Sequence, residues 1–197
     1  MRKKLPGRAP TTFIVNRPLS VAEAALVVNV PEAEKYVAAL REKFDPSARL
    51  GAPAHITLVY PFAEPGEIGA STLSALDAVI SQAASFWFHL VALRRFMDTL
   101  YLAPEPAEPF VAMTQAIVDR FPDYRPYGGQ FASVVPHLTV ARGSRDDLGF
   151  AEESLTGTLA VGGIPAHCRE VVLIENSSGR WQRMHTFCLT SIQNTDG

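Results

Sequence analysis

Two histidine–threonine pairs lie in apolar runs that are typical of β-strands. His55 and Thr57 fall in AHITLVYPF, and His137 and Thr139 fall in PHLTVAR. Side chains alternate between the two faces of a strand, so residues i and i+2 share a face. In each segment the histidine and the threonine therefore point the same way. The aliphatic residues that point the other way, and can pack on helices, are Ile56, Leu58, Leu138 and Val140.

These four polar side chains suit phosphodiester chemistry. In such a reaction a nucleophile loses a proton and a leaving alkoxide gains one. Imidazole titrates near neutral pH, so one histidine can act as base and the other as acid. Threonine hydroxyls can donate hydrogen bonds to the non-bridging phosphate oxygens, where negative charge accumulates. This chemistry needs no metal ion and no cofactor, provided that the two strands lie side by side and face one cleft.

The alternative is that both histidines are structural. A single His-x-Thr occurs often by chance, and a lone histidine in a strand is usually a residue whose hydrogen bonds are satisfied within the fold. Two copies in similar hydrophobic surroundings are harder to explain in this way. The repetition therefore favours a functional interpretation.

The elements predicted around the motifs repeat as well. Apolar residues at helical spacing predict helices over 31–44, 71–84 and 108–121, and we expect a short helix with a loop over 144–157. Alternating or β-branched runs predict strands over 24–30, 55–60, 86–96, 99–103, 137–141, 170–175 and 184–190. A helix, a loop and a strand beginning with His-x-Thr thus occur once in each half of the chain. This order favours two copies of one lobe.

Composition narrows the class of protein. The 197 residues are 47% hydrophobic and 19% charged, as in ordinary globular proteins, and the net charge of −2 argues against a protein that coats long nucleic acid. We expect one bilobal domain over 21–190, a flexible basic tail at 1–20 and a short tail at 191–197. Two cysteines make no disulfide framework, and the chain shows no secretory signal or membrane-spanning run. We therefore expect a cytoplasmic protein without a membrane partner, a monomer by default with its oligomeric state left open.

The two motifs resemble the signature of the 2H phosphoesterase superfamily, which is named for its two His-x-Thr/Ser motifs. HITLVYPF is similar in particular to the 2′-5′ RNA ligase-like branch. The resemblance implies an α+β fold of two pseudo-symmetric lobes, each a small antiparallel sheet backed by helices, around a central cleft. It implies that His55 and His137 are catalytic and that Thr57 and Thr139 bind the substrate phosphate. It also implies substrates with 2′,3′-cyclic phosphates or 2′-5′ linkages, at RNA ends or in small nucleotides.

Three further residues are candidate substrate contacts. Arg142 closes PHLTVAR and matches a position that is often basic in the family, although its side chain starts on the face opposite His137. A surface charge at a strand end is the equal alternative. Tyr127 and Phe131 precede the second motif and could stack on a base, although packing within the loop would also account for them.

The sequence leaves other functions open. Hydrolysis and 2′-5′ ligation use the same groups in opposite directions, so the sequence does not choose between them or between acid and base for each histidine. A non-catalytic module could bind nucleotides or RNA ends through the same cleft. A zinc hydrolase could use His55, His137 and His185, but the paired threonines fit phosphate better than zinc, and we expect no metal.

Overall fold

The chain forms a single antiparallel sheet with helices packed against it. The computed structural model describes residues 22–129, 134–159 and 162–191. The strands are β1 (Ala24–Asn29), β2 (His55–Val59), β3 (Phe86–Phe96), β4 (Thr99–Glu105), β5 (Leu138–Arg142), β6 (Ile164–Cys168), β7 (Glu170–Glu175) and β8 (Gln182–Cys188). The helices are α1 (Pro31–Phe44), α2 (Pro46–Arg49), α3 (Ala70–Ile80), α4 (Glu108–Arg120) and α5 (Arg145–Leu159), with 3₁₀ turns η1 (Pro65–Glu67) and η2 (Pro126–Gly129). The predicted α+β class is confirmed.

The sheet consists of two similar halves that meet at the motif strands. Its strand order is β6-β3-β4-β5-β2-β1-β7-β8, and the junction is the pair β5–β2, where Ile56 lies opposite Leu138. On one side of the junction stands the unit β1–α1–β2, and on the other the unit β4–α4–β5, each with its two strands paired antiparallel. The two His-x-Thr strands therefore occupy equivalent places in the two halves.

The outer strands are exchanged between the halves. β3 follows the first motif in sequence but pairs with β4 in the second half. β7 follows the second motif but pairs with β1 in the first half. The edge strand β6 is separated from β7 by Arg169 alone, and Ala84 bridges to Thr190 near the other edge. The sheet must therefore curl strongly for these connections to close.

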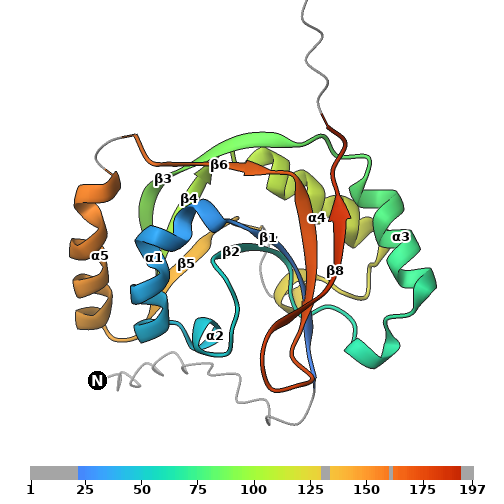
Figure 1. The fold of residues 1–197 in the computed structure, drawn as a ribbon, viewed down its shortest axis with the longest axis horizontal. Coiled ribbons are helices and arrows are strands. Elements are labelled where there is room, and N and C mark those ends of the chain that lie inside the picture. The colour runs from blue at the N-terminus through green and yellow to red at the C-terminus, as the bar shows by residue number, and fades with distance from the viewer. Residues whose placement is uncertain (1–21, 130–133, 160–161, 192–197) are drawn as a thin grey trace, which may run out of the picture.

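All four long helices lie on one face of the sheet. Within this face, α1 and α5 lie at the left end in Figure 1, and α3 and α4 lie at the right end. α1 and α5 pack against β5, and α4 packs against β2, so each crossover helix covers the motif strand of the other half. Their apolar stripes join Leu26, Ile56 and Leu138 in the main core.

We call the opposite face of the sheet the open face. It has a small apolar cluster of its own, to which the helices contribute no residue. That cluster consists of Ala25, Val27, Val172 and Ile174, with Tyr60 and Trp181 packed against it. Because β1 and β7 are buried on both faces, they are continuous apolar runs in the sequence rather than alternating ones.

The first helix illustrates why the predicted elements form. Pro31 occupies its first turn, where a missing N–H costs nothing, with acidic residues in the first turn and basic ones in the last. Val37, Leu40 and Phe44 are buried as the spacing predicts, whereas Tyr36 remains exposed.

Some boundaries and elements differ from the sequence prediction. β6 was not predicted, and α2 lies in a segment expected to be a loop. α3 ends earlier than predicted, and α5 is one continuous helix where a short helix with a loop was expected. The expected tails lie outside the described residues, apart from Ser191, and no described helix is long and apolar enough to cross a membrane.

Candidate active site

Strand register brings the two motifs onto the open face. His55 opens β2 and His137 directly precedes β5. Their neighbours Ile56 and Leu138 lie opposite one another and both belong to the main core. His55, Thr57, His137 and Thr139 therefore point to the other face of the sheet.

Each imidazole is fixed by a matching hydrogen bond. Nδ1 of His55 lies 2.7 Å from the carbonyl oxygen of Pro53, and Nδ1 of His137 lies 2.8 Å from that of Val135. A carbonyl oxygen can only accept, so Nδ1 must carry the proton in both rings. In the neutral form each Nε2 then keeps its lone pair, the state that a proton acceptor needs.

The segment before His55 is held from α1. The backbone N–H of Ala54 donates to the carboxylate of Glu34 at 2.5 Å. This bond lies between Pro53, which fixes the imidazole, and His55 itself. Glu34 therefore positions the histidine through the backbone.

A buried ion pair lies within electrostatic reach of the same histidine. Arg41 donates from Nε and Nη2 to Oδ2 of Asp45 at 3.2 and 3.0 Å, and both residues are buried. Oδ1 of Asp45 accepts from the backbone N–H and the hydroxyl of Ser47, so Asp45 also caps the N-terminus of α2. The pair thus joins the end of α1 to the loop that leads to β2.

The surroundings of His55 disfavour its charged form. Burial lowers the pKa of His55 from 6.5 to about 4, opposed by the Pro53 hydrogen bond, with a smaller lowering from Arg41 and a raising effect of Asp45. The charge of His137 also lowers it, which places the two imidazoles within reach of one another's field.

The pKa of His137 is lowered as well. Burial is the main cause, the hydrogen bond to Val135 opposes it, and the positive charge of Arg142 adds to it. Both rings are therefore held in the neutral form near pH 7 until an anion lies between them. A bound phosphate would favour their protonation.

Aromatic rings surround the second motif. Tyr101 lies opposite Thr139 in the β4–β5 pair and is buried. It stacks on Phe96 with ring centroids 4.3 Å apart, and both rings meet His137 edge-on at 5.3 and 5.1 Å. These contacts restrict the orientation of the His137 ring. Neither aromatic residue carries a motif signal in the sequence, because only strand pairing brings them to the histidine.

The threonines are half-buried beside these groups. Thr57 lies opposite Val27, and Thr139 opposite Tyr101. No hydrogen bond of either hydroxyl is present within the described part of the chain. Two imidazoles and two available hydroxyls on one face can bind an anion and move protons.

Of the three other predicted substrate contacts, the structure describes the side chain of Arg142 alone. Arg142 is exposed and lies opposite Thr99 at the end of β5, where its charge reaches His137. Tyr127 lies in η2, where the structure describes its backbone only. Phe131 lies outside the described residues.

The three-histidine alternative finds no geometric support. His185 lies opposite Leu173, a main-core residue, and contacts Phe187 of the same core. It therefore turns away from the open face, and the suggestion that it reaches the cleft was wrong. Across the described ranges, no three His, Cys, Asp or Glu side chains come together as a metal site.

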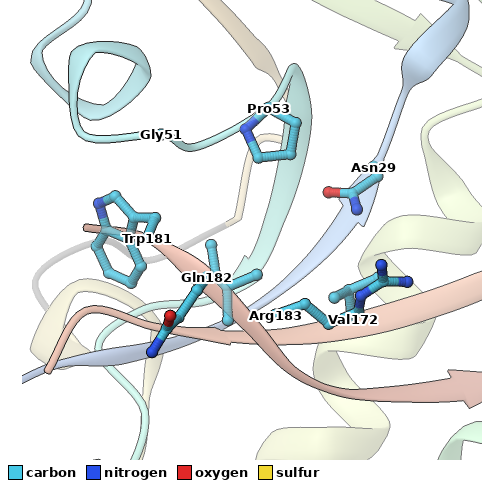
Figure 2. A pocket seen from close by; sticks show the side chains of 8 residues that line it. Asn29, Gly51, Pro53, Val172, Trp181, Gln182 and Arg183 are labelled. Carbon is cyan, nitrogen blue, oxygen red and sulfur yellow. The ribbon is translucent and has the colours of Figure 1, made fainter. Parts of the chain in front are cut away.

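A pocket of about 220 Å³ adjoins the first motif, and no sequence motif indicates it. Asn29, which lies opposite His55, lines it from β1, and Trp181, Gln182 and Arg183 line it from the start of β8 (Figure 2). The loop that carries Pro53 closes it on a third side. Strands at opposite ends of the sequence build this pocket, so no local pattern could reveal it.

Comparison with known proteins places this geometry in a family. Residues 30–180 match the family model described as the 2′-5′ RNA ligase superfamily. The fold is similar to that of TT0787 of Thermus thermophilus, with a TM-score of 0.56 and 16% identity over 87% of this chain and 100% of that one. It is also similar to E. coli LigT complexed with 3′-AMP, with a TM-score of 0.55 and 19% identity over 87% and 99% of the two chains. No curated protein sequence matches the chain.

Proposed function

Because the chain belongs to the 2′-5′ RNA ligase superfamily, we propose that it is a metal-independent 2H phosphoesterase. Its substrates are 2′,3′-cyclic phosphates or 2′-5′ phosphodiesters at RNA ends or in nucleotides. If the 5′-hydroxyl of a second RNA takes the place of water, the same groups form its bond to phosphorus as the bond from phosphorus to the 3′-oxygen breaks, and the two RNA ends are joined through a 2′-5′ bond. RNA substrates and two free cysteines favour a cytoplasmic location.

The proposed mechanism divides the two protons between the two rings. Nε2 of His55 takes a proton from the attacking water, whose oxygen forms the new bond to phosphorus. The bond from phosphorus to the leaving ribose oxygen breaks, and Nε2 of His137 donates its proton to that oxygen. Thr57 and Thr139 donate hydrogen bonds to the non-bridging oxygens. His55 takes the part of the base because its pKa is lowered to about 4, so it is neutral at physiological pH.

One observation carries the proposal. Both histidines donate Nδ1–H to a carbonyl two residues upstream, and their phase in the sheet directs both rings to one face. A structural histidine needs no such duplicate arrangement in the two halves. Binding of 3′-AMP by E. coli LigT, which has a similar fold, supports nucleotides as the substrate class.

Substitution of the two histidines tests the proposal. We expect His55→Ala and His137→Ala each to lower the turnover of an adenosine 2′,3′-cyclic phosphate by about a hundredfold or more, the usual effect of removing a positioned acid or base. The double variant should lose less than the product of the two effects, since the groups act together. Thr57→Val and Thr139→Val should cost less, and EDTA should leave the rate unchanged.

The control is His89→Ala, which removes an exposed histidine of β3. It should keep the wild-type rate. Full activity of a folded His55→Ala or His137→Ala variant would show that the paired motifs are structural.

A further inference from the structure

Asn29 has a polar atom that the proposed chemistry does not use. Its Oδ1 is buried and has no hydrogen-bond partner among the described residues. An unpaired buried acceptor costs about 1–3 kcal/mol, so such groups in native proteins usually meet a ligand or water. Asn29 lies directly opposite His55, and Figure 2 shows its amide directed into the pocket. A donor placed there would lie beside the first imidazole.

The remaining walls of the pocket are apolar on one side and positive on another. Val172, Ile174 and the indole of Trp181 form the apolar part. Of the lining residues that the structure describes, only Arg183 is charged, and its exposed guanidinium has no partner within the described ranges. Glu175, next to Gln182 in the sheet, is already satisfied by Gln182 and Ser177. The pocket therefore combines a flat apolar surface, an amide and a cation.

The size of the pocket restricts the ligand. About 220 Å³ is smaller than the roughly 300–1,000 Å³ of sites that enclose a whole drug-sized molecule. Neighbouring strands lie roughly 4.8 Å apart, and β8 is the third strand from β2, so these two strands are separated by roughly 14 Å. The side chain of Arg183 on β8 covers part of this distance. One nucleoside with a phosphate beyond it fits this span.

We propose that this pocket binds the nucleoside of the substrate, next to the reacting phosphate. The amide of Asn29 hydrogen-bonds the base or the ribose, Trp181 contacts the base, and Arg183 binds a phosphate of the same nucleotide. The inference rests on the proposed function for the position of the reacting phosphate between the two histidines. Beyond the proposed function, the inference states that the pocket recognises the nucleoside of the substrate. A phosphodiester without a nucleoside should therefore be a poor substrate.

Binding can be measured without any turnover. The chain has two tryptophans, Trp87 and Trp181, and the first is 63% exposed on β3. In a Trp87→Phe parent, fluorescence therefore reports Trp181 alone. We expect adenosine and 3′-AMP to quench this fluorescence in a saturable way, and inorganic phosphate to leave it unchanged. Absence of quenching by both adenosine compounds, or equal quenching by phosphate, would overturn the proposal.

Two variants of the parent separate the contacts. Asn29→Ala should weaken both adenosine and 3′-AMP about tenfold, the usual cost of one lost hydrogen bond to a ligand. It should not lower the thermal midpoint, because its oxygen has no partner to lose. Arg183→Gln should weaken 3′-AMP about tenfold and adenosine by less than about twofold, since only the nucleotide carries a charge for it. Gln115→Ala, on the exposed face of α4, is the control and should match the parent.

Kinetics distinguish failure of the pocket from failure of the proposed function. With adenosine 2′,3′-cyclic phosphate, Asn29→Ala should raise KM about tenfold and leave kcat nearly unchanged. Turnover with an unchanged KM in Asn29→Ala would refute the nucleoside pocket and leave the phosphoesterase standing. Nucleotide binding that depends on Asn29, without any turnover by the parent, would support the pocket and refute the phosphoesterase.

Discussion

The two histidines share a tautomer but not an environment. Both donate Nδ1–H to a backbone carbonyl, so both present Nε2 to the open face. Burial lowers both pKa values, but Arg142 stands near His137 alone, and Arg41 and Asp45 stand near His55. Two equivalent side chains can therefore take opposite parts in one reaction, because their surroundings differ.

The pH dependence of kcat/KM should reflect these surroundings. The acidic limb should lie near pH 4, where the base His55 becomes protonated, and the basic limb below pH 6.5, where His137 loses its proton. The optimum should therefore lie on the acidic side of pH 6.5. In the pH dependence of kcat, both limbs should lie at higher pH than in that of kcat/KM, because the bound phosphate favours the protonated imidazoles.

Arg142→Gln gives this assignment a sharper test. Removing the positive charge should raise the pKa of His137 and move the basic limb alone to higher pH. Arg145→Gln, on the first turn of α5, should leave the profile unchanged. Movement of the acidic limb in Arg142→Gln would instead make His137 the base.

At the residue scale the sequence predicts what lies within one strand. The phase of His55 and Thr57, and that of His137 and Thr139, follows from alternation alone. Asn29 and Tyr101 were missed because they reach the histidines through pairing between strands. The burial of Arg41 has no signal in the sequence either, since it depends on the fold closing over the ion pair with Asp45.

At the scale of elements, α1 holds the first motif in place. Glu34→Ala removes the acceptor for the N–H of Ala54, so the segment from Pro53 to His55 loses its tether. We expect kcat to fall about tenfold or more, since misplacement of a reacting group by about 1 Å can cost a hundredfold. Glu34→Gln keeps an acceptor oxygen and should retain most of the rate. Glu42→Ala, an exposed change on the same helix, should have no effect, and a similar loss in all three variants would argue against the tether.

The edge strand β6 was missed because of its composition. Gly162, Gly163 and Pro165 are typical of a loop, and the sequence alone favours one there. Proline is tolerated at the edge of a sheet, where its missing N–H faces no neighbour. β6 pairs only with β3 in the described part of the sheet, and this position allows Pro165.

The two glycines before β6 provide a matched pair for stability. Both have positive φ, +96° for Gly162 and +82° for Gly163, so an alanine is strained at either position. A Cβ on Gly163 would lie 2.7 Å from the carbonyl oxygen of Leu90, whereas one on Gly162 meets nothing within 4 Å. Gly162→Ala should therefore lower the free energy of unfolding by about 1–2 kcal/mol, and Gly163→Ala by at least about 1 kcal/mol more. Urea denaturation measures the difference, and equal losses would show that β6 shifts freely away from β3.

At the scale of the whole molecule, the sequence predicted the repeat but not its exchange. Helix, loop and motif strand recur in each half, and this pattern led to two lobes. That β3 crosses into the second half, and β7 into the first, depends on which distant edges pair. Apolar strands such as β7 can pair with several partners of similar composition. Only the packing of the complete sheet selects one of them.

Stability should depend on pH through the half-buried histidines, whose pKa values are lowered in the folded chain. In the unfolded chain His55 has its ordinary pKa of 6.5, whereas in the folded chain the pKa is about 4. Between these values the unfolded state binds more protons, so the free energy of unfolding falls as the pH is lowered from 6.5 toward 4. His55→Gln should show a shallower fall in urea denaturation across this range. His89→Gln, an exposed change, should follow the wild type, and identical slopes in all three proteins would contradict the lowered pKa of His55.

The exchange of strands also affects how the chain is made. The N–H of Glu23 donates to Asn176 Oδ1, 153 positions further along, and β1 pairs with β7 over a similar separation. During synthesis β1 leaves the ribosome early and waits for a partner that is translated late. Its free edge is meanwhile a template for pairing with other nascent chains. Release of a chain broken off before β7 would leave that edge permanently bare, so incomplete translation products of this protein should aggregate rather than fold as half-molecules.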